Sequence, residues 1–276
     1  MPKTEDTKRT QGEMSFLDHL EVLRWHLVRS VAAILIFAVG AFVAKELVFD
    51  TIILGPQKAD FISYRLMCQI SQFLGMSDAL CIDDMPFHLM NISMAGQFTT
   101  HLWVAFVAGL IVAFPYLLWE FWRFIQPALQ VSEKKYAKGV VFFASMLFLI
   151  GVSFGYFLIA PLSVHFLGSY QVSEAVPNQI GLNSYISTVT TIVLAGGLIF
   201  ELPILVYFLA KIGILSPDSM RTYRKHAFVA TLIISAIITP PDISSQLMVT
   251  LPLIVLYEIS IKIAARVVKK EQKING

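Results

Sequence analysis

Charged residues are scarce in this chain. Only 14% of its 276 residues are Asp, Glu, Lys or Arg, while 56% are hydrophobic and the mean hydropathy is +0.69. Soluble domains carry about 25% charged residues. The shortage excludes an ordinary soluble domain and indicates that a membrane is the solvent for most of the chain.

Motifs for nucleotide and metal chemistry are also missing. The sequence has no glycine-rich phosphate loop, and its histidines form no His-Glu-x-x-His metal pattern. We therefore expect neither a cofactor nor a metal site.

Cysteine is rare too, with Cys68 and Cys81 as the only two. Both lie in the connection that follows the first apolar run, where an oxidising compartment would let them form a disulfide. The alternative is two unpaired small residues on a partly buried loop. The sequence alone leaves both interpretations open.

What the chain does have is six long apolar runs, at residues 27–47, 97–118, 138–160, 186–210, 226–240 and 246–264. Because hydrocarbon cannot satisfy backbone polar groups, such runs must form helices or a closed barrel, and Val140 to Ile150 lacks the alternation of barrel strands. The sequence therefore predicts an all-α polytopic membrane domain at residues 1–264 with a basic tail at 265–276. The fifth run, about 21 Å as a helix, is short for a hydrocarbon core of about 30 Å, so we expect local bilayer thinning.

Basic residues fix the orientation of these spans. They gather before the first run, between the second and third, between the fourth and fifth, and after the sixth, while the other side holds only Lys45, Lys58 and Arg65. Since cytoplasmic connections carry the excess of Lys and Arg, both termini are predicted to be cytoplasmic, with an even number of spans. The first run shows no cleavage site, so we expect it to be retained as a span.

The connections carry their own patterns. Residues 48–95 and 161–185 are expected to cap the bundle externally, and Tyr64 to Leu74 has the spacing of a short interfacial helix. On the cytoplasmic side, residues 14–26 have an apolar stripe that predicts an amphipathic surface helix. The second connection holds an aromatic stretch followed by Glu133, which would lie in the first turn of the third span.

Glu201 is the sharpest polar exception within a run. A carboxylate at membrane depth costs about 2.5–3.5 kcal/mol unless it faces a polar cavity or takes up a proton, so it indicates function by default. Pro203, two residues on, predicts a kink. The alternative is a hydrogen-bonded carboxyl that only locks helix packing.

The last two runs form a hairpin around Thr239 to Gln246. Its double proline must end the fifth helix, and Asp242 or Ser244 can cap the sixth. Glu258 is a second deep carboxylate, which we expect to pair with Lys262 four residues on.

Four motifs, in order, resemble the signatures of one family. His19-Leu20-Glu21-Val22-Leu23-Arg24 is similar to its N-terminal His-Leu-x-Glu-Leu-Arg, and Phe124, Pro127, Leu129 and Glu133 match its Phe-x-x-Pro-x-Leu followed by a Glu. Phe200, Glu201 and Pro203 match Phe-Glu-x-Pro, Thr239 to Gln246 match Thr-Pro-Pro-Asp-x-x-Ser-Gln, and Gly155, Tyr156 and Pro161 also fit. From about Ser15 to Ile263 the chain thus resembles the TatC family, the polytopic receptor subunit of twin-arginine protein translocation.

The N-terminal motif departs from the family pattern. Val22 replaces the glutamate, Glu21 carries an acid one position earlier, and His26 stands where a basic residue is expected. A one-residue shift turns a helical side chain by about 100°. The acidic contact that the family makes at this motif therefore does not carry over to Val22, and Glu21 replaces it only if the helix turns or the ligand adapts.

The resemblance implies a binding machine rather than an enzyme. It implies six transmembrane helices in the cytoplasmic (inner) membrane, a concave, cupped bundle with short fifth and sixth helices, and use of the proton-motive force. The implied partners are twin-arginine signal peptides of folded cargo, single-span TatA- and TatB-like proteins, other copies of the chain and membrane lipid, but no nucleic acid.

The resemblance also implies roles for single residues. Those implied in signal-peptide binding are Glu133, Phe124, Glu21, Arg24, Leu20, Pro127 and Leu129, and those implied in intramembrane polar contacts or partner docking are Glu201, Gln246, Asp242, Pro203 and Tyr156. A guanidinium prefers a planar carboxylate, so we expect Glu133 to read an arginine, with Phe124 giving apolar or cation–π contact. Without the resemblance, Glu133 would be a solvated charge balanced by Lys134 or Lys135.

Two other classes stay open. An ion-coupled small-molecule transporter could titrate Glu201, although such folds usually show paired repeats, and the long first external connection and the terminal hairpin have no counterparts. An intramembrane enzyme would need paired catalytic groups at one depth, whereas Glu201 and Glu258 lie on different predicted helices.

Overall fold

The computed structural model describes residues 16–73, 75, 81, 85, 87–125, 137–173, 178–239 and 243–275. Its helices are α1 (Phe16–Val43), η1 (Glu46–Ile53), η2 (Gly55–Gln57), α2 (Ile62–Phe73), α3 (Gly96–Ile125), α5 (Ala137–Phe154), η4 (Gly155–Ile159), α6 (Ala160–Ser169), α7 (Leu182–Phe200), α8 (Leu202–Lys211), α9 (Pro217–Thr222), α10 (Arg224–Ile238) and α11 (Ile243–Asn275). Two short strands, β1 (His88–Met90) and β2 (Gln179–Gly181), pair in parallel.

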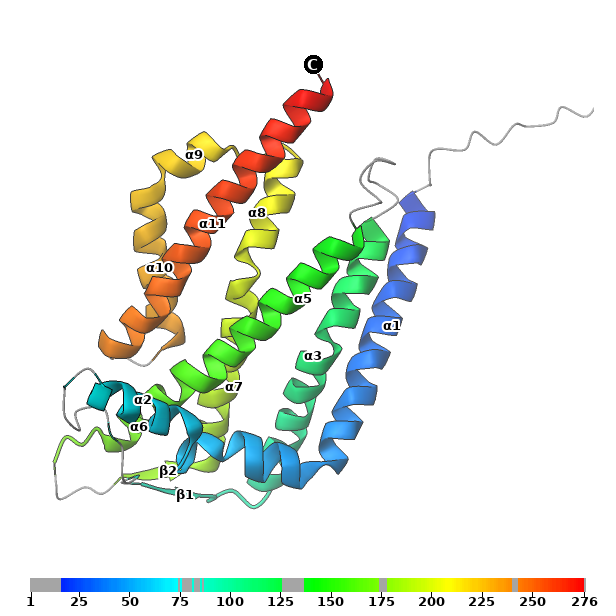
Figure 1. Ribbon diagram of the computed structural model, residues 1–276. Coiled ribbons are helices and arrows are strands. Elements are labelled where there is room, and N and C mark those ends of the chain that lie inside the picture. The colour runs from blue at the N-terminus through cyan, green and yellow to red at the C-terminus, as the bar shows by residue number, and fades with distance from the viewer. Residues whose placement is uncertain are drawn as a thin grey trace, which may run out of the picture.

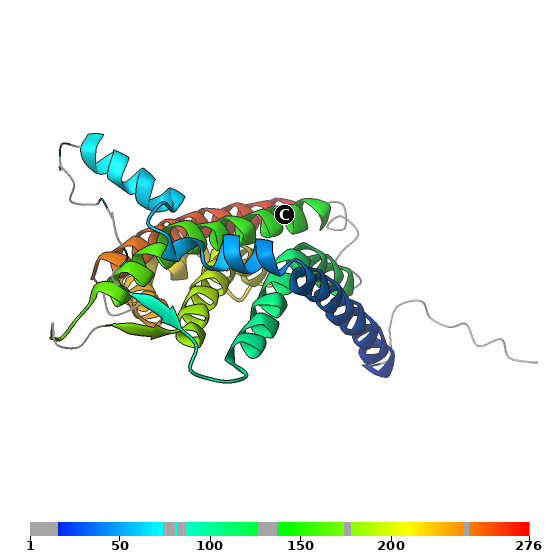
Figure 2. The same ribbon diagram turned by 90° about the horizontal axis from the view of Figure 1, so that it is seen from below.

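The long helices form a bundle with two distinct ends (Figure 1). The start of α1, the end of α3, α9 and the end of α11 lie at one end, and α2, β1 and β2 lie at the other. Seen from below, α1 lies at the edge of the molecule beside α3 (Figure 2), on which it chiefly packs. The two chain ends of the described part therefore lie at the same end of the bundle.

Five stretches within the described residues are long and apolar enough to cross a membrane: Leu20–Val43, Gly96–Ile125, Gly139–Ser169, Leu182–Lys211 and Ser245–Lys269. The predicted all-α polytopic fold is confirmed. The predicted fifth span corresponds to α10, whose 15 residues extend about 22 Å as an α-helix. Because α10 falls short of the usual spanning length, the count of six spans stays a prediction.

Helix ends differ from the sequence-based expectations in several places, and three of the differences concern the connections. The predicted surface helix and first span are one continuous helix, α1. The second span was expected to end at residue 118, but α3 continues to Ile125. The irregular cap expected from Pro161 begins instead as helix α6, because Pro161 lies in its first turn, where a missing N–H costs no helical hydrogen bond.

The break between α7 and α8 lies at Glu201, where a kink was expected. Pro203 occupies the first turn of α8, and the Glu201 carbonyl accepts the N–H groups of Ile204 and Leu205 at 3.0 Å. Just before the break, a Cβ on Gly196 would lie 2.7 Å from the Gly151 carbonyl oxygen of α5. The absence of a side chain there lets α5 and α7 meet backbone to backbone, as membrane helices commonly do.

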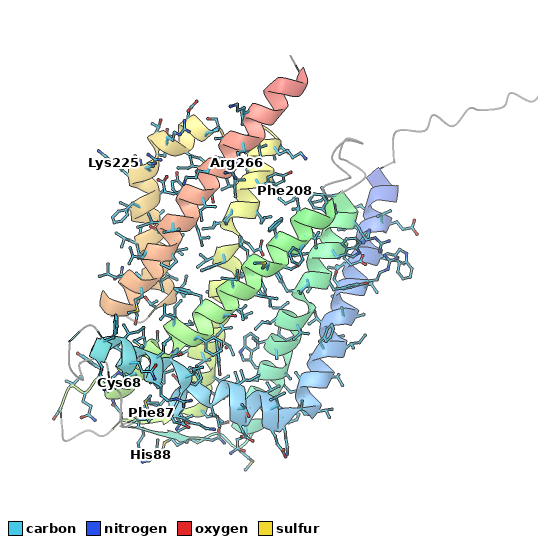
Figure 3. The ribbon with its side chains drawn as sticks, viewed as in Figure 1. Cys68, Phe87, His88, Phe208, Lys225 and Arg266 are labelled. Atoms are coloured by element: carbon cyan, nitrogen blue, oxygen red, sulfur yellow. A yellow bond between two sulfur atoms is a disulfide. The ribbon has the colours of Figure 1, made fainter. Side chains whose placement is uncertain are left out.

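The end that carries α2 is tied together by buried polar contacts. The Tyr64 hydroxyl lies 2.8 Å from the Pro56 carbonyl oxygen and 2.9 Å from that of Pro161, and burial raises the Tyr64 pKa above its usual value. Cys68 of α2 forms a disulfide with Cys81, and Figure 3 shows Cys68 at the same end as Phe87 and His88. The cysteines are thus paired in the structure, which the sequence left open.

Candidate functional site

A cluster of charged side chains lies between the start of α1 and the end of α3. At its centre is Glu120, which is 1% exposed. Its Oε2 lies 2.5 Å from His26 Nδ1 and 3.6 Å from an Arg29 nitrogen, and its Oε1 accepts hydrogen bonds from the Tyr116 hydroxyl at 3.0 Å and from Arg123 at 3.3 Å. Basic and hydroxyl groups thus surround this buried carboxylate from both helices.

The described residues among those predicted to bind a signal peptide lie on the two helices that form this cluster. The Phe124 ring contacts the His26 ring edge to face, with centroids 6.2 Å apart. Leu20, Glu21 and Arg24 are exposed on the first part of α1, where the Arg24 guanidinium lies 5.6 Å from the Trp25 ring centre. The structure therefore brings the N-terminal motif and the start of the second motif together.

Several predicted residues lie outside the described part of the chain. These are Glu133, Pro127 and Leu129 of the second connection and Asp242 of the hairpin. Their predicted roles stay predictions.

Glu201 is the second carboxylate held inside the bundle. Its Oε1 is buried and has no hydrogen-bond partner among the described residues. The side chain borders a cavity of about 180 Å³ between α3, α5 and α8, whose walls include Trp122, Val141 and Phe208. Figure 3 shows Phe208 on α8. The surroundings of Glu201 are therefore almost wholly apolar.

Polar side chains also join α10 to α11. Gln246 Nε2 donates to the Leu232 carbonyl at 3.3 Å, and the Ser235 and Thr250 hydroxyls lie 2.8 Å apart and are buried. Gln246, predicted to dock a partner, thus holds the terminal hairpin together. Tyr156 lies elsewhere, where its hydroxyl donates to the Ile52 carbonyl at 2.7 Å.

The predicted pairing of Glu258 with Lys262 is wrong. Glu258 instead accepts two contacts from Arg224 of α10, with Nε–Oε1 at 2.8 Å and Nη2–Oε2 at 2.9 Å. A two-pronged guanidinium contact matches the planar carboxylate better than a single ammonium does. The ion pair therefore links two helices rather than two turns of one helix.

Glu120 was missed from the sequence because the predicted second span stopped two residues before it. The sequence did contain a signal for it: an acid near the end of the second apolar run, and basic residues at the start of the first run, which a pair of antiparallel helices would bring together.

Residues Gly151 to Gly155 match the Gly-x-Ser-x-Gly pattern of a nucleophile elbow, but the structure does not give them that role. Ser153 lies within α5 and donates to the Leu149 carbonyl at 2.8 Å, whereas an elbow needs a strand-to-helix turn. Within the described ranges, no group of three His, Cys, Asp or Glu side chains could hold a metal.

Comparison with known proteins gives a consistent result. The profile of the family described as "Sec-independent protein translocase protein (TatC)" matches residues 18–252. A protein of that name from Blattabacterium sp. subsp. Periplaneta americana (strain BPLAN) is 39% identical over 96% of this chain and 100% of its own length. The Helicobacter pylori (strain ATCC 700392 / 26695) protein of that name is 35% identical over 90% of this chain and 87% of its own.

Solved structures agree with the sequence relatives. A crystal structure described as "Twin Arginine Translocase Receptor- TatC" superposes with a TM-score of 0.67 at 31% identity, covering 91% of this chain and 99% of that one. The match supports a translocase rather than the ion-coupled transporter that the sequence left open. This chain is a multi-pass membrane protein that belongs to the TatC family of Sec-independent protein translocase proteins.

Proposed function

We propose that this protein is the receptor that recognises twin-arginine export signals at the cytoplasmic face of the inner membrane. The end of the bundle at which α1 begins and α11 ends then faces the cytoplasm, and α2 with the disulfide faces the oxidising side. Two considerations support this orientation: the lysines and arginines concentrate in the connections at the terminal end, and disulfides persist outside the cytosol. In this proposal α10 serves as the short fifth of six spans.

One observation carries the proposal: the contact between His26 of α1 and Phe124 of α3. It places the N-terminal motif beside the motif that starts at Phe124, although the two are nearly a hundred residues apart in sequence. An extended signal peptide can reach both at once only if they lie at the same end. Exposed Leu20 and Glu21 extend this surface along α1.

The chemistry of recognition follows from the ligand. A pair of guanidinium groups needs planar acceptors, and a carboxylate binds a guanidinium by two parallel hydrogen bonds. Glu133 is the acid that we assign to one arginine, Phe124 offers a ring face for cation–π contact, and Glu21 is the candidate for the other arginine. Pro127 and Leu129 would add apolar contact around Glu133.

Partner recruitment is assigned to the other side of the bundle. Gln246 and the α10–α11 hairpin would receive a single-span TatA- or TatB-like helix, and Glu201 would contact the incoming signal or partner within the membrane. Glu201 Oε1, which is buried and has no hydrogen-bond partner in the described part of the chain, supports this, since a buried acceptor gains from any donor brought to it. A proton-motive force would drive the transport of folded cargo.

The test is site-specific crosslinking in membrane vesicles. A photoreactive amino acid at the exposed position 121 should crosslink a signal peptide that carries two arginines, and replacing both with lysines should abolish the product. Glu133→Gln should do the same, whereas Asp218→Asn, which removes an exposed acid on α9 at the same end, should not. Crosslinking that ignores the arginines would refute the proposal.

A further inference from the structure

The seam between α1 and α3 is held at three levels. In the middle, a Cβ on Gly109 of α3 would lie 2.5 Å from the Ala38 backbone nitrogen, so the helices touch there without side chains. Toward the α2 end, the Phe42 and His101 rings stack with centroids 4.1 Å apart. At the opposite end, the contact is the set of polar bonds to Glu120.

Near Glu120, the side of α1 that faces away from α3 is exposed. Trp25, Leu27 and Val28 are each at least 49% exposed, so these side chains are only partly covered by the described residues. His26 and Arg29 point to Glu120 instead. The polar contacts that join α1 to α3 at this end of the described chain therefore converge on one carboxylate of α3.

Glu120 also positions His26, whose ring contacts Phe124 of the proposed recognition surface. Glu120 holds His26 through Nδ1, and the His26 ring lies against Phe124, four residues after Glu120 on α3. Arg123 and Tyr116 fix the other oxygen of Glu120, so its own position is set within α3. Being 1% exposed, Glu120 cannot itself meet a peptide in this arrangement.

We infer that Glu120 is a positioning residue for signal-peptide recognition: through His26 it sets α1 in register with Phe124, and so determines how well the receptor distinguishes two arginines from two lysines. The inference rests on the proposed function. It assigns a role to the buried carboxylate beyond joining two helices, because the register that it sets is part of the binding surface.

The measurement is the ratio of crosslinking from position 121 to the twin-arginine and twin-lysine peptides. Glu120→Gln keeps the side-chain volume but loses the charge, and the ratio should fall roughly tenfold, as expected for losing a hydrogen bond to a charged group. His26→Gln removes the same contact from the other helix and should give the same fall. In the double variant the ratio should fall no further than in either single variant, because both substitutions break the same contact between Glu120 and His26.

The matched control is His101→Ala, which removes the ring stacked on Phe42 and so loosens the same seam at its far end. It should leave the ratio unchanged. Equal falls in Glu120→Gln and His101→Ala would show that only seam stability matters and would overturn the inference, as would an unchanged ratio in Glu120→Gln. If Glu120→Gln fails to accumulate in membranes, His26→Gln decides alone. A wild-type protein that does not distinguish the peptides refutes the proposed function instead.

Discussion

Glu120 and Glu201 both hold carboxylate oxygens away from solvent, but their surroundings are opposite. Glu120 has bonds from a histidine, a tyrosine and an arginine and a second arginine within 3.6 Å. Glu201 has apolar walls, and its buried Oε1 has no partner among the described residues. One acid is fully satisfied by the chain itself, and the other is not.

The difference separates two uses of a buried acid. A buried charge is tolerated when opposite charges and hydrogen bonds surround it, and removing one member is then costly. An acid that has no partner among the described residues gives the fold nothing in return for its desolvation, and our proposal explains it by a contact made outside this chain. Glu120 therefore serves the arrangement of α1 and α3, and Glu201 is the stronger candidate for a contact with a ligand or partner.

The largest effect on stability is expected from Glu120→Ala. Removing the carboxylate leaves Arg29, Arg123 and His26 facing one another without a counter-charge. The expected loss is about 3 kcal/mol, the lower end for a broken buried pair, because the two arginines are half exposed. Thermal unfolding of the purified protein in detergent measures it. Asp218→Ala, at an exposed ion pair, is the control, and an equal loss there would contradict the comparison.

Glu201→Leu is expected to act in the opposite direction. No bond among the described residues is lost, and a carboxylate at membrane depth costs about 2.5–3.5 kcal/mol, so stability should stay the same or rise. Export of a folded reporter should nevertheless fall to background, and Glu201→Gln should behave alike. Wild-type export in both variants, with stability lost in Glu201→Leu, would leave only a packing role.

The contrast also shows what the sequence can and cannot predict. The sequence identified Glu201 as a candidate functional residue because it interrupts an apolar run. The short α10 and the polytopic fold were predicted from the lengths of the apolar runs. Glu120 and the Arg224–Glu258 pair were not found, because hydrophobic periodicity describes one helix at a time and both contacts join two helices. The helical start of the connection at residues 161–185 was not predicted either, although proline is accepted in the first turn of a helix.

A smaller effect is expected at the ion pair between α10 and α11. Both partners are about half exposed, so Arg224→Gln should cost no more than about 1 kcal/mol. The loss should shrink further in high salt, because exposed charges are screened. Unfolding midpoints at two salt concentrations test this. A loss of stability as large as that of Glu120→Ala would mean that the difference in burial between Glu120 and Glu258 does not determine how much each ion pair contributes to stability.

Glu21→Ala should have the smallest effect on stability and a clear effect on binding. The side chain is exposed on α1, and it forms no hydrogen bond or ion pair with another described residue, so the unfolding midpoint should not move. If Glu21 substitutes for the glutamate that the family motif has at position 22, Glu21→Ala should lower crosslinking to the twin-arginine peptide. The weak crosslinking to the twin-lysine peptide should stay the same. Normal crosslinking would show that the acid lost at Val22 has no replacement on α1, so that recognition of the second arginine must come from another part of the receptor.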